Sequence, residues 1–184
     1  MEIKLEERSA APPQLVVMGV SGAGKTTVGQ ALAEALSLQF VDADNLHPAS
    51  NVAKMAAGIP LNDEDRFPWL RQVGAELDRF QGEGIVLACS ALKRRYRDLI
   101  REQAAGTTFV HLSASERVLA NRVIGRPGHF MPASLLQSQI ATLEPLEQGE
   151  AGVTVDCSQP VAELVREVVS ALTAAAPGAE SHAL

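Results

Sequence analysis

The sequence predicts a three-layer α/β domain built around a parallel sheet of five strands. Short apolar runs of strand length alternate with segments whose apolar residues recur at helical spacing. This alternation is typical of βαβ units, in which a helix crosses over the sheet and joins two parallel strands. The 184 residues are enough for one domain with a buried core, and 46% of them are hydrophobic, as in ordinary globular proteins.

We expect the domain to cover residues 14–173, with strands and helices following one another in alternation. The first strand is the apolar run 15–18, and the helix after it has apolar residues at Val28 and Leu32. A second strand ends at Asp42. The later strands are expected at 85–88, 108–112 and 153–155, and the later helices at 50–57, from about 67, and at 91–102, 133–143 and 160–173.

Local signals place the ends of several helices. Gly58 stands where a left-handed glycine closes a helix. Phe67-Pro68 marks the start of the next helix, because proline suits a first turn. Trp69 belongs to the apolar face of that helix and is expected in the core. Ser113 and Glu116 have the spacing of a capping box, which predicts another helix start.

Composition argues against several classes of function. The formal net charge is −6, so a basic surface for nucleic acid is not expected. No window holds 18 uninterrupted apolar residues, which argues against a membrane span, and the acidic segment 1–13 lacks the apolar region of a secretory signal. Cys89 and Cys157 are expected to be reduced, buried thiols of a cytoplasmic protein. Segments 1–13 and 174–184 are expected to be flexible tails.

A glycine-rich loop carries the strongest functional signal. Residues 19–26 read GVSGAGKT, a complete G-x-x-x-x-G-K-[ST] match between a predicted strand and a predicted helix. In that setting backbone N–H groups and the helix N-terminus surround phosphate oxygens. Lys25 then reaches the β- and γ-phosphates, and the Thr26 hydroxyl ligates Mg²⁺. The residues expected to bind the nucleotide are Gly19, Val20, Ser21, Gly22, Ala23, Gly24, Lys25, Thr26 and Thr27.

Two aspartates follow the second predicted strand, at the edge where open α/β sheets bind ligands. Their spacing of two residues allows one of Asp42 and Asp44 to face the water shell of Mg²⁺ and the other to face a phosphoryl acceptor. The alternative is a pair of turn or cap aspartates, since aspartate is common after strands.

Beyond the loop, several segments resemble one family of P-loop kinases, the gluconokinases of the branch that includes shikimate and nucleoside-monophosphate kinases. The matching segments are MGVSGAGKT (18–26), DADNLHP (42–48), NVAKMAAGIPLNDEDRFPWL (51–70), CSALKRRYRDLIR (89–101) and GRPGHF (125–130). The resemblance implies a three-layer P-loop kinase fold with a mobile lid over about 122–132, and ATP with Mg²⁺ as cofactors. It places Asp42 on the metal side, through water, and Asp44 on the acceptor side.

The same resemblance implies the reaction. It predicts ATP-dependent phosphorylation of D-gluconate at its 6-hydroxyl, giving 6-phospho-D-gluconate and ADP in gluconate catabolism. A related kinase that acts on shikimate or a nucleoside monophosphate is the alternative within enzymes, and a non-catalytic nucleotide-binding module is the alternative of another class. No N-K-x-D run for guanine is present, which argues against a GTPase. Relatives of this fold are often dimers, and the sequence leaves a homodimer open.

A sugar-acid acceptor needs cations for its carboxylate and polar groups for its hydroxyls. Substrate contacts are expected from Asp44, His47, Arg66, Ser90, Lys93 and Arg97. Lys93 and Arg97 are expected to share a helix face toward the substrate carboxylate or the transferred phosphate, whereas Arg94 and Arg95 are expected to be solvated. The alternative for His47 is a place in an exposed turn, and the alternative for Arg66 is an ion pair with the acidic residues beside it.

The predicted lid supplies the remaining candidates. In kinases that resemble this sequence, such a lid closes over ATP and excludes water. Arg122 would lie over the adenine or the α/β-phosphates, and Arg126 would neutralise charge that develops in transfer. Gln159 and Pro160 are expected at the edge of the adenine pocket, although Pro160 also suits a helix start; His129 has no assigned step. The residues expected to act in transfer itself are Lys25, Asp44, Lys93 and Arg126.

Overall fold

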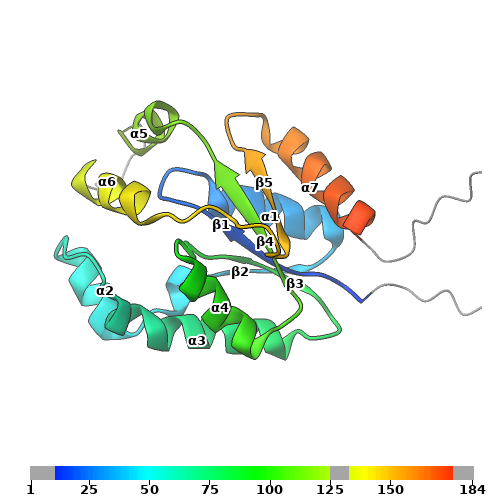
Figure 1. The fold of residues 1–184 in the computed structure, drawn as a ribbon, viewed down its shortest axis with the longest axis horizontal. Coiled ribbons are helices and arrows are strands. Elements are labelled where there is room, and N and C mark those ends of the chain that lie inside the picture. The colour runs from blue at the N-terminus through cyan, green and yellow to red at the C-terminus, as the bar shows by residue number, and fades with distance from the viewer. Residues whose placement is uncertain (1–10, 125–132, 176–184) are drawn as a thin grey trace, which may run out of the picture.

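The computed structural model describes residues 11–124 and 133–175, which form one parallel sheet with helices on both faces (Figure 1). The strands are β1 (Gln14–Met18), β2 (Gln39–Asp42), β3 (Ile85–Ala88), β4 (Thr107–Ser113) and β5 (Gly152–Asp156). They lie in the order β2-β3-β1-β4-β5, and each neighbouring pair is parallel. The predicted five-stranded parallel sheet is confirmed.

The strand register brings three chain segments to one edge of the sheet. Ala88 of β3 pairs with Val17 of β1 on one side and with Asp42 of β2 on the other. All three strands therefore end at the same level, and the segments that follow them lie next to one another. Because these segments carry the glycine-rich loop, Asp44 and Lys93, the strand order gathers most of the predicted site.

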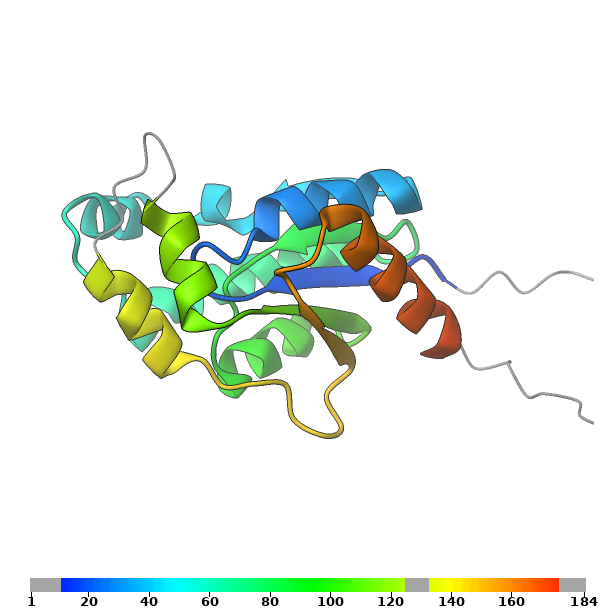
Figure 2. The same ribbon diagram turned by 90° about the horizontal axis from the view of Figure 1, so that it is seen from above.

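The helices form two outer layers and a group at one end of the sheet. Their bounds are α1 (Lys25–Leu36), α2 (Ala49–Ala56), α3 (Asp63–Arg79), α4 (Arg94–Gln103), α5 (Glu116–Ile124), α6 (Ala133–Thr142) and α7 (Val161–Ala175), with a 3₁₀ turn η1 at Ala43–Leu46. Helices α1 and α7 cover one face, and α3 and α4 cover the other (Figures 1 and 2). Helices α2, α5 and α6 lie beyond the carboxyl ends of the strands, at the left of Figure 1.

Alternation along the central strand builds two cores. Leu15 and Val17 of β1 pack with α1, α5, α6 and α7, whereas Val16 and Met18 pack with α3 and α4. Successive side chains of a strand point to opposite faces, so a strand that is covered on both sides is apolar throughout. All five residues of β1 are buried accordingly, including Gln14 at the end of the strand.

Helix α3 begins at Asp63, four residues before the predicted start. The cause is a capping box: the Asn62 side chain accepts from the Asp65 N–H at 2.9 Å, and the Asp65 carboxylate accepts from the Asn62 N–H at 3.1 Å. Pro68 consequently lies inside the helix instead of in its first turn, which corrects the prediction. Trp69 is buried on the predicted apolar face, as expected.

Helix α4 begins at Arg94, after the left-handed residue Ala91 (φ 42°) and with Lys93 as its N-cap. The prediction that Lys93 and Arg97 share a helix face toward the substrate is wrong for Arg97. Its guanidinium is fully buried and binds both oxygens of Glu150, with Nε to Oε2 at 2.6 Å and Nη2 to Oε1 at 2.7 Å. It also donates to backbone carbonyls of the segments at 91–92 and 144–145.

The pair of Arg97 and Glu150 holds the chain after α6 against α4. Burial by itself would raise the pKa of Glu150, but hydrogen bonds from Arg97 and from the Glu147 N–H, together with the Arg97 and Arg94 charges, lower it to about 2. Both partners are therefore charged at neutral pH. A fully buried, bidentate ion pair with further carbonyl acceptors is a structural element, and sequence spacing gives no sign of a partner 53 residues away.

We predict that Arg97→Ala lowers the free energy of unfolding by about 3–5 kcal/mol, because the Glu150 carboxylate stays buried without its partner. Urea unfolding followed by circular dichroism measures the change. Arg166→Ala is the matched control, since Arg166 is an exposed arginine paired with Glu163 on α7 and its removal should change little. Equal effects of the two substitutions would contradict the structural role of Arg97.

The other buried groups agree with the sequence. Cys89 and Cys157 are both free and buried, as predicted. Within residues 11–124 and 133–175, no helix combines the length and apolarity that a bilayer crossing requires. His111 on β4 is buried, with only its Nδ1 near a partner, the Thr154 hydroxyl at 3.5 Å.

Stability is expected to fall in mild acid, partly through His111. Burial first, and the Arg97 charge second, lower the pKa of His111 below 6.5. The unfolded chain therefore takes up a proton near pH 6.5 that the folded chain resists, so stability decreases as the pH falls below that value. Denaturant midpoints between pH 7.5 and pH 5.5 should decline less steeply in His111→Leu than in the wild type. Parallel slopes would contradict this contribution.

Candidate active site

The glycine-rich loop leaves the start of α1 open toward the carboxyl edge of the sheet. Gly24 is the N-cap of α1 with φ 92°, and no side chain caps the helix there. A Cβ on Gly24 would meet nothing within 4 Å, whereas a Cβ on Gly22 would come within 2.9 Å of Val123 on α5. The loop is thus fixed against α5 on one side and open on the other. Open backbone donors at a helix N-terminus form an anion site.

Thr26 and Asp42 place two oxygen ligands side by side at the end of this loop. The Thr26 hydroxyl donates to Asp42 Oδ2 at 2.9 Å, and Asp42 Oδ1 accepts from the Asp44 N–H at 3.1 Å. Oxygen donors of this kind suit Mg²⁺, which keeps several waters and takes few protein ligands. No group of three His, Cys, Asp or Glu residues within the described ranges forms a metal cage. The residues therefore fit a Mg²⁺ that phosphate oxygens and water also hold.

A cleft of about 380 Å³ adjoins the loop on the side of α7. It is lined by Gly22, Ala23, Gly24, Thr27, Val28, Arg122, Cys157, Gln159, Val161 and Leu164. Arg122 is held at its rim, since its Nη2 donates to the Cys157 carbonyl at 2.6 Å. Pro160 is absent from this lining; its carbonyl accepts the first backbone bonds of α7 from Glu163 and Leu164, so it starts a helix.

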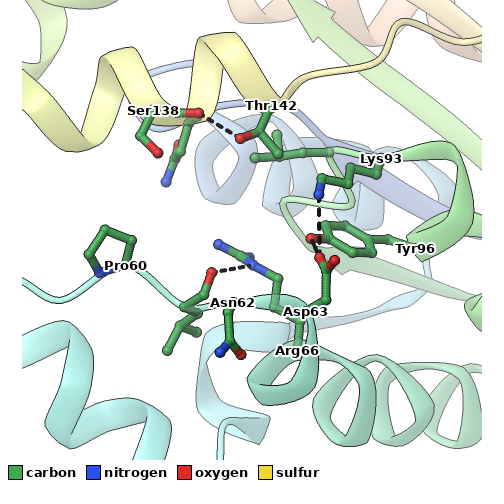
Figure 3. A pocket seen from close by; sticks show the side chains of 11 residues that line it. Pro60, Asn62, Asp63, Arg66, Lys93, Tyr96, Ser138 and Thr142 are labelled. Carbon is green, nitrogen blue, oxygen red and sulfur yellow. Dashed lines mark hydrogen bonds and ion pairs between the residues drawn. The ribbon is translucent and has the colours of Figure 1, made fainter.

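A second pocket, of about 240 Å³, lies between α3, α4 and α6 (Figure 3). It is lined by Pro60, Leu61, Asn62, Asp63, Arg66, Leu92, Lys93, Tyr96, Ser138, Gln139 and Thr142. Of the predicted substrate ligands, Arg66 and Lys93 line it. Arg66 donates to the Leu61 carbonyl at 3.3 Å and lies over the Tyr96 ring, instead of pairing with the acids beside it.

Asp63 binds two cationic side chains and one hydroxyl at this pocket. One carboxylate oxygen accepts from Lys93 Nζ at 3.3 Å and from the Tyr96 hydroxyl, and the other accepts from Arg95. Figure 3 shows Asp63, Lys93 and Tyr96 converging in this way. The guanidinium of Arg95, expected to be solvated, is half exposed but tied to Asp63. The pocket is therefore lined by two cations, Arg66 and Lys93, of which Asp63 holds Lys93 in place, and such a lining suits an anionic, hydroxyl-rich ligand.

Asp44 and His47 lie on and just after η1, outside the lining of that pocket. The Asp44 side chain is 81% exposed. The alternative of an exposed turn is wrong for His47, whose side chain is 3% exposed and stacks on Trp69 with ring centroids 4.0 Å apart. His47 is more buried than Asp44 because its ring packs against Trp69, which is itself buried in the core beside α3.

Cys89 is a buried free thiol that directly follows β3. Burial raises its pKa to about 12, and the charges of Asp44, Lys25 and Arg66 act on it further. These three charged residues belong to different elements, since Lys25 begins α1, Asp44 lies in η1 and Arg66 lies on α3.

Gln139 on α6 bridges the two parts directly. Its Oε1 accepts from the Ser21 N–H of the glycine-rich loop at 2.7 Å, and the same side chain lines the pocket. Sequence reasoning missed Gln139, Asp63, Tyr96, Ser138 and Thr142. The capping-box spacing from Asn62 was a usable signal for Asp63, but nothing in the sequence marks the residues of α6.

The remaining predicted residues are Ser90, Arg97, Arg126 and His129. The backbone carbonyl of Ser90 accepts from the Gly19 N–H at 3.4 Å, so Ser90 supports the loop, and its role as a substrate ligand stays a prediction. Arg97 lies in the structural pair with Glu150. Arg126 and His129, with most of the predicted lid, lie outside the described residues.

Comparison with known proteins decides the family. The shikimate kinase family profile matches residues 21–173. The probable gluconokinase of Xenopus tropicalis is 43% identical over 171 residues, 84% of this chain and 90% of the relative. The gluconokinase of Gluconobacter oxydans (strain 621H) is 52% identical over 141 residues, 72% of this chain and 76% of the relative.

The crystal structure of a gluconokinase from Sinorhizobium meliloti 1021 superposes with a TM-score of 0.82 at 50% identity, covering 90% of this chain and 94% of that one. The chain belongs to the gluconokinase family. A shikimate kinase from Acinetobacter baumannii has a TM-score of 0.58 at 17% identity and shares the fold alone. The gluconokinase and P-loop kinase fold that the sequence motifs predicted are confirmed, and this gluconokinase-family chain is an enzyme of the kinase class.

Proposed function

We propose that this enzyme transfers the γ-phosphoryl group of ATP to the 6-hydroxyl of D-gluconate, giving 6-phospho-D-gluconate and ADP. The observation that carries the proposal is the junction of the phosphate loop with a cation-lined pocket, bridged by Gln139 between Ser21 and that pocket. Family membership supports the choice of sugar acid. The 6-position follows from the resemblance of the motifs.

On the nucleotide side, Lys25 and the open start of α1 would neutralise the phosphates. Thr26 and Asp42 would hold Mg²⁺, which supplies charge neutralisation on the β- and γ-phosphates when bound. The cleft beside α7 has room for the base, with Arg122 and Gln159 at its wall. Arg126 remains our candidate for the developing transition-state charge.

On the acceptor side, the two cations that line the pocket, Arg66 and Lys93, suit the gluconate carboxylate. Arg66 and Lys93 already point into the pocket, and their long side chains are held over the Tyr96 ring at 5.8 and 5.4 Å. Ser138 and Thr142 supply hydroxyl partners for a polyol from the α6 side. Asp44, near the end of β2, would orient or deprotonate the attacking hydroxyl.

The free thiols fit the expected compartment. Both Cys89 and Cys157 are buried and unpaired with each other, as is usual for proteins of a reducing compartment. We therefore include a cytoplasmic location in the proposal, together with ATP and Mg²⁺ as cofactors.

The test is a coupled assay of ADP release with gluconate, shikimate and AMP as acceptors, each with Mg²⁺ and ATP. We expect a saturable rate with gluconate and background rates with the others. Galactonate, an epimer of gluconate, measures how strictly the pocket reads hydroxyl configuration. A clear rate with shikimate or AMP and none with gluconate would overturn the proposed acceptor.

Lys25→Ala is expected to lower kcat by several orders of magnitude, because the ammonium neutralises the β- and γ-phosphates in the transition state. The fold should persist, since Lys25 is the first residue of α1, is only partly buried, and donates to a backbone carbonyl of its own loop, that of Val20 at 3.2 Å. Circular dichroism and the coupled assay report the two effects. Near-normal turnover would refute the phosphate assignment.

Asp44→Asn is expected to lower kcat about 100-fold or more while KM for ATP changes little, because the lost carboxylate acts on the acceptor hydroxyl in transfer. Asp78→Asn, on the far part of α3, is a control for loss of one surface carboxylate. An unchanged kcat in Asp44→Asn would move the acceptor-side role to another residue.

A further inference from the structure

A group of three side chains behind Asp44 has no part in the chemistry assigned so far. His47 follows η1, Asn51 lies on α2 and Trp69 lies on α3. The side chain of His47 is 3% exposed, and Asn51 and Trp69 are each 1% exposed. Buried polar side chains are nearly always hydrogen-bonded, so the partners of His47 indicate what its ring does at this place.

The imidazole ring is fixed in place from one face and from one edge. It stacks on the Trp69 ring with an interplanar angle of 16°. Trp69 is in turn tied to η1, because its Nε1 donates to the Ala43 carbonyl at 2.8 Å. The ring therefore moves together with η1, the segment that carries Asp44.

Hydrogen bonding also settles which ring nitrogen carries the proton. Asn51 Nδ2 donates to the Asp65 carbonyl at 2.9 Å, which fixes the orientation of the amide, and it faces His47 Nδ1 at 3.3 Å. An amide nitrogen only donates, so Nδ1 accepts and the proton lies on Nε2. Burial lowers the pKa of His47, the Arg66 charge lowers it further, and Asp44 raises it, so the ring is neutral at pH 7.

The protonated nitrogen faces the Asp44 carboxylate. His47 Nε2 lies 4.0 Å from Asp44 Oδ1. That gap exceeds a hydrogen bond by about 1 Å, and such contacts commonly tighten when substrate binds. An exposed carboxylate otherwise samples several rotamers, which works against the alignment that phosphoryl transfer requires.

We propose that His47 is a positioning residue whose Nε2–H holds the Asp44 carboxylate toward the acceptor hydroxyl, and that Asn51 enforces the tautomer. This rests on the acceptor-side role of Asp44 in the proposed function. It also replaces our expectation that His47 contacts substrate, because Nδ1 is occupied by Asn51 and Nε2 is directed at Asp44.

Two substitutions separate the N–H from the ring. His47→Phe keeps an aromatic ring for the stack on Trp69 and removes the donor. His47→Gln keeps an amide N–H that reaches about as far as Nε2 and removes the ring. We expect kcat to fall about 10- to 100-fold in His47→Phe, with KM for ATP unchanged, and to return to within about threefold of the wild type in His47→Gln.

Thermal midpoints should show the opposite order. His47→Gln should lose several degrees because the stack is gone, whereas His47→Phe should lose less. A purely structural role requires activity to follow stability, so wild-type kcat in His47→Phe with impaired kcat in His47→Gln would overturn the proposal. If His47→Phe does not fold, His47→Gln decides alone, since retained kcat supports the donor and lost kcat contradicts it.

A double-mutant cycle separates this inference from the proposed function. In the Asp44→Asn background, His47→Phe should lower kcat less than about twofold further, because the group that it positions is already changed. Additive losses would show that His47 acts independently of Asp44 and would refute the inference. If Asp44→Asn alone leaves kcat unchanged, the acceptor-side assignment fails, and the inference fails with it.

Discussion

The constraint on which this structure depends is that an acidic chain must bring two anions into contact. With a net charge of −6, the protein as a whole repels both ATP and a sugar acid. Positive potential has to be produced locally, and it comes from two kinds of source. The open N-terminus of α1 supplies backbone dipoles without adding net charge, and the side chains of Lys25, Arg66 and Lys93 supply cations.

Asp63 restrains part of this positive charge, because it binds Lys93. Unrestrained lysine and arginine side chains lose much entropy when they bind a ligand. By accepting from Lys93, Arg95 and Tyr96 at once, the Asp63 carboxylate orders them before substrate arrives. The negative charge of Asp63 also lowers the net positive charge of the pocket. Arg97 has a different role. Its charge is buried with Glu150 away from the pocket, and its hydrogen bonds hold the chain after α6 in place.

Helix α6 connects that fastening to the chemistry. Leu136 anchors α6 in the core with α1 and α7, the segment after it is tied to Arg97, and Gln139 reaches the Ser21 N–H. A nucleotide phosphate that approached Ser21 would compete with the Gln139 oxygen for this N–H. The glycine-rich loop and the pocket are therefore both in contact with α6, and the pocket wall depends on packing far from the loop.

Short-range patterns were enough to predict the parallel sheet and the core position of Trp69, and they marked Thr26 and Asp42, which the fold brings together beside the glycine-rich loop. These follow from short-range patterns, because glycine spacing, apolar runs and strand-end aspartates each specify local backbone geometry. The start of α3 was missed although its signal is local, since Asn62 and Asp65 form a capping box with aspartate in the place of the usual glutamate.

Which charged residues face the pocket depends on packing between elements that are distant in the sequence. Arg97 and Lys93 are four positions apart, yet one is buried against a carboxylate 53 residues away and the other lines the pocket. Gln139 carries no motif and gained its place because α6 packs beside the loop. Long-range partners of this kind arise from packing between elements whose relative position no local pattern encodes. The glycine-rich loop could therefore be predicted from the sequence, whereas the lining of the pocket could not.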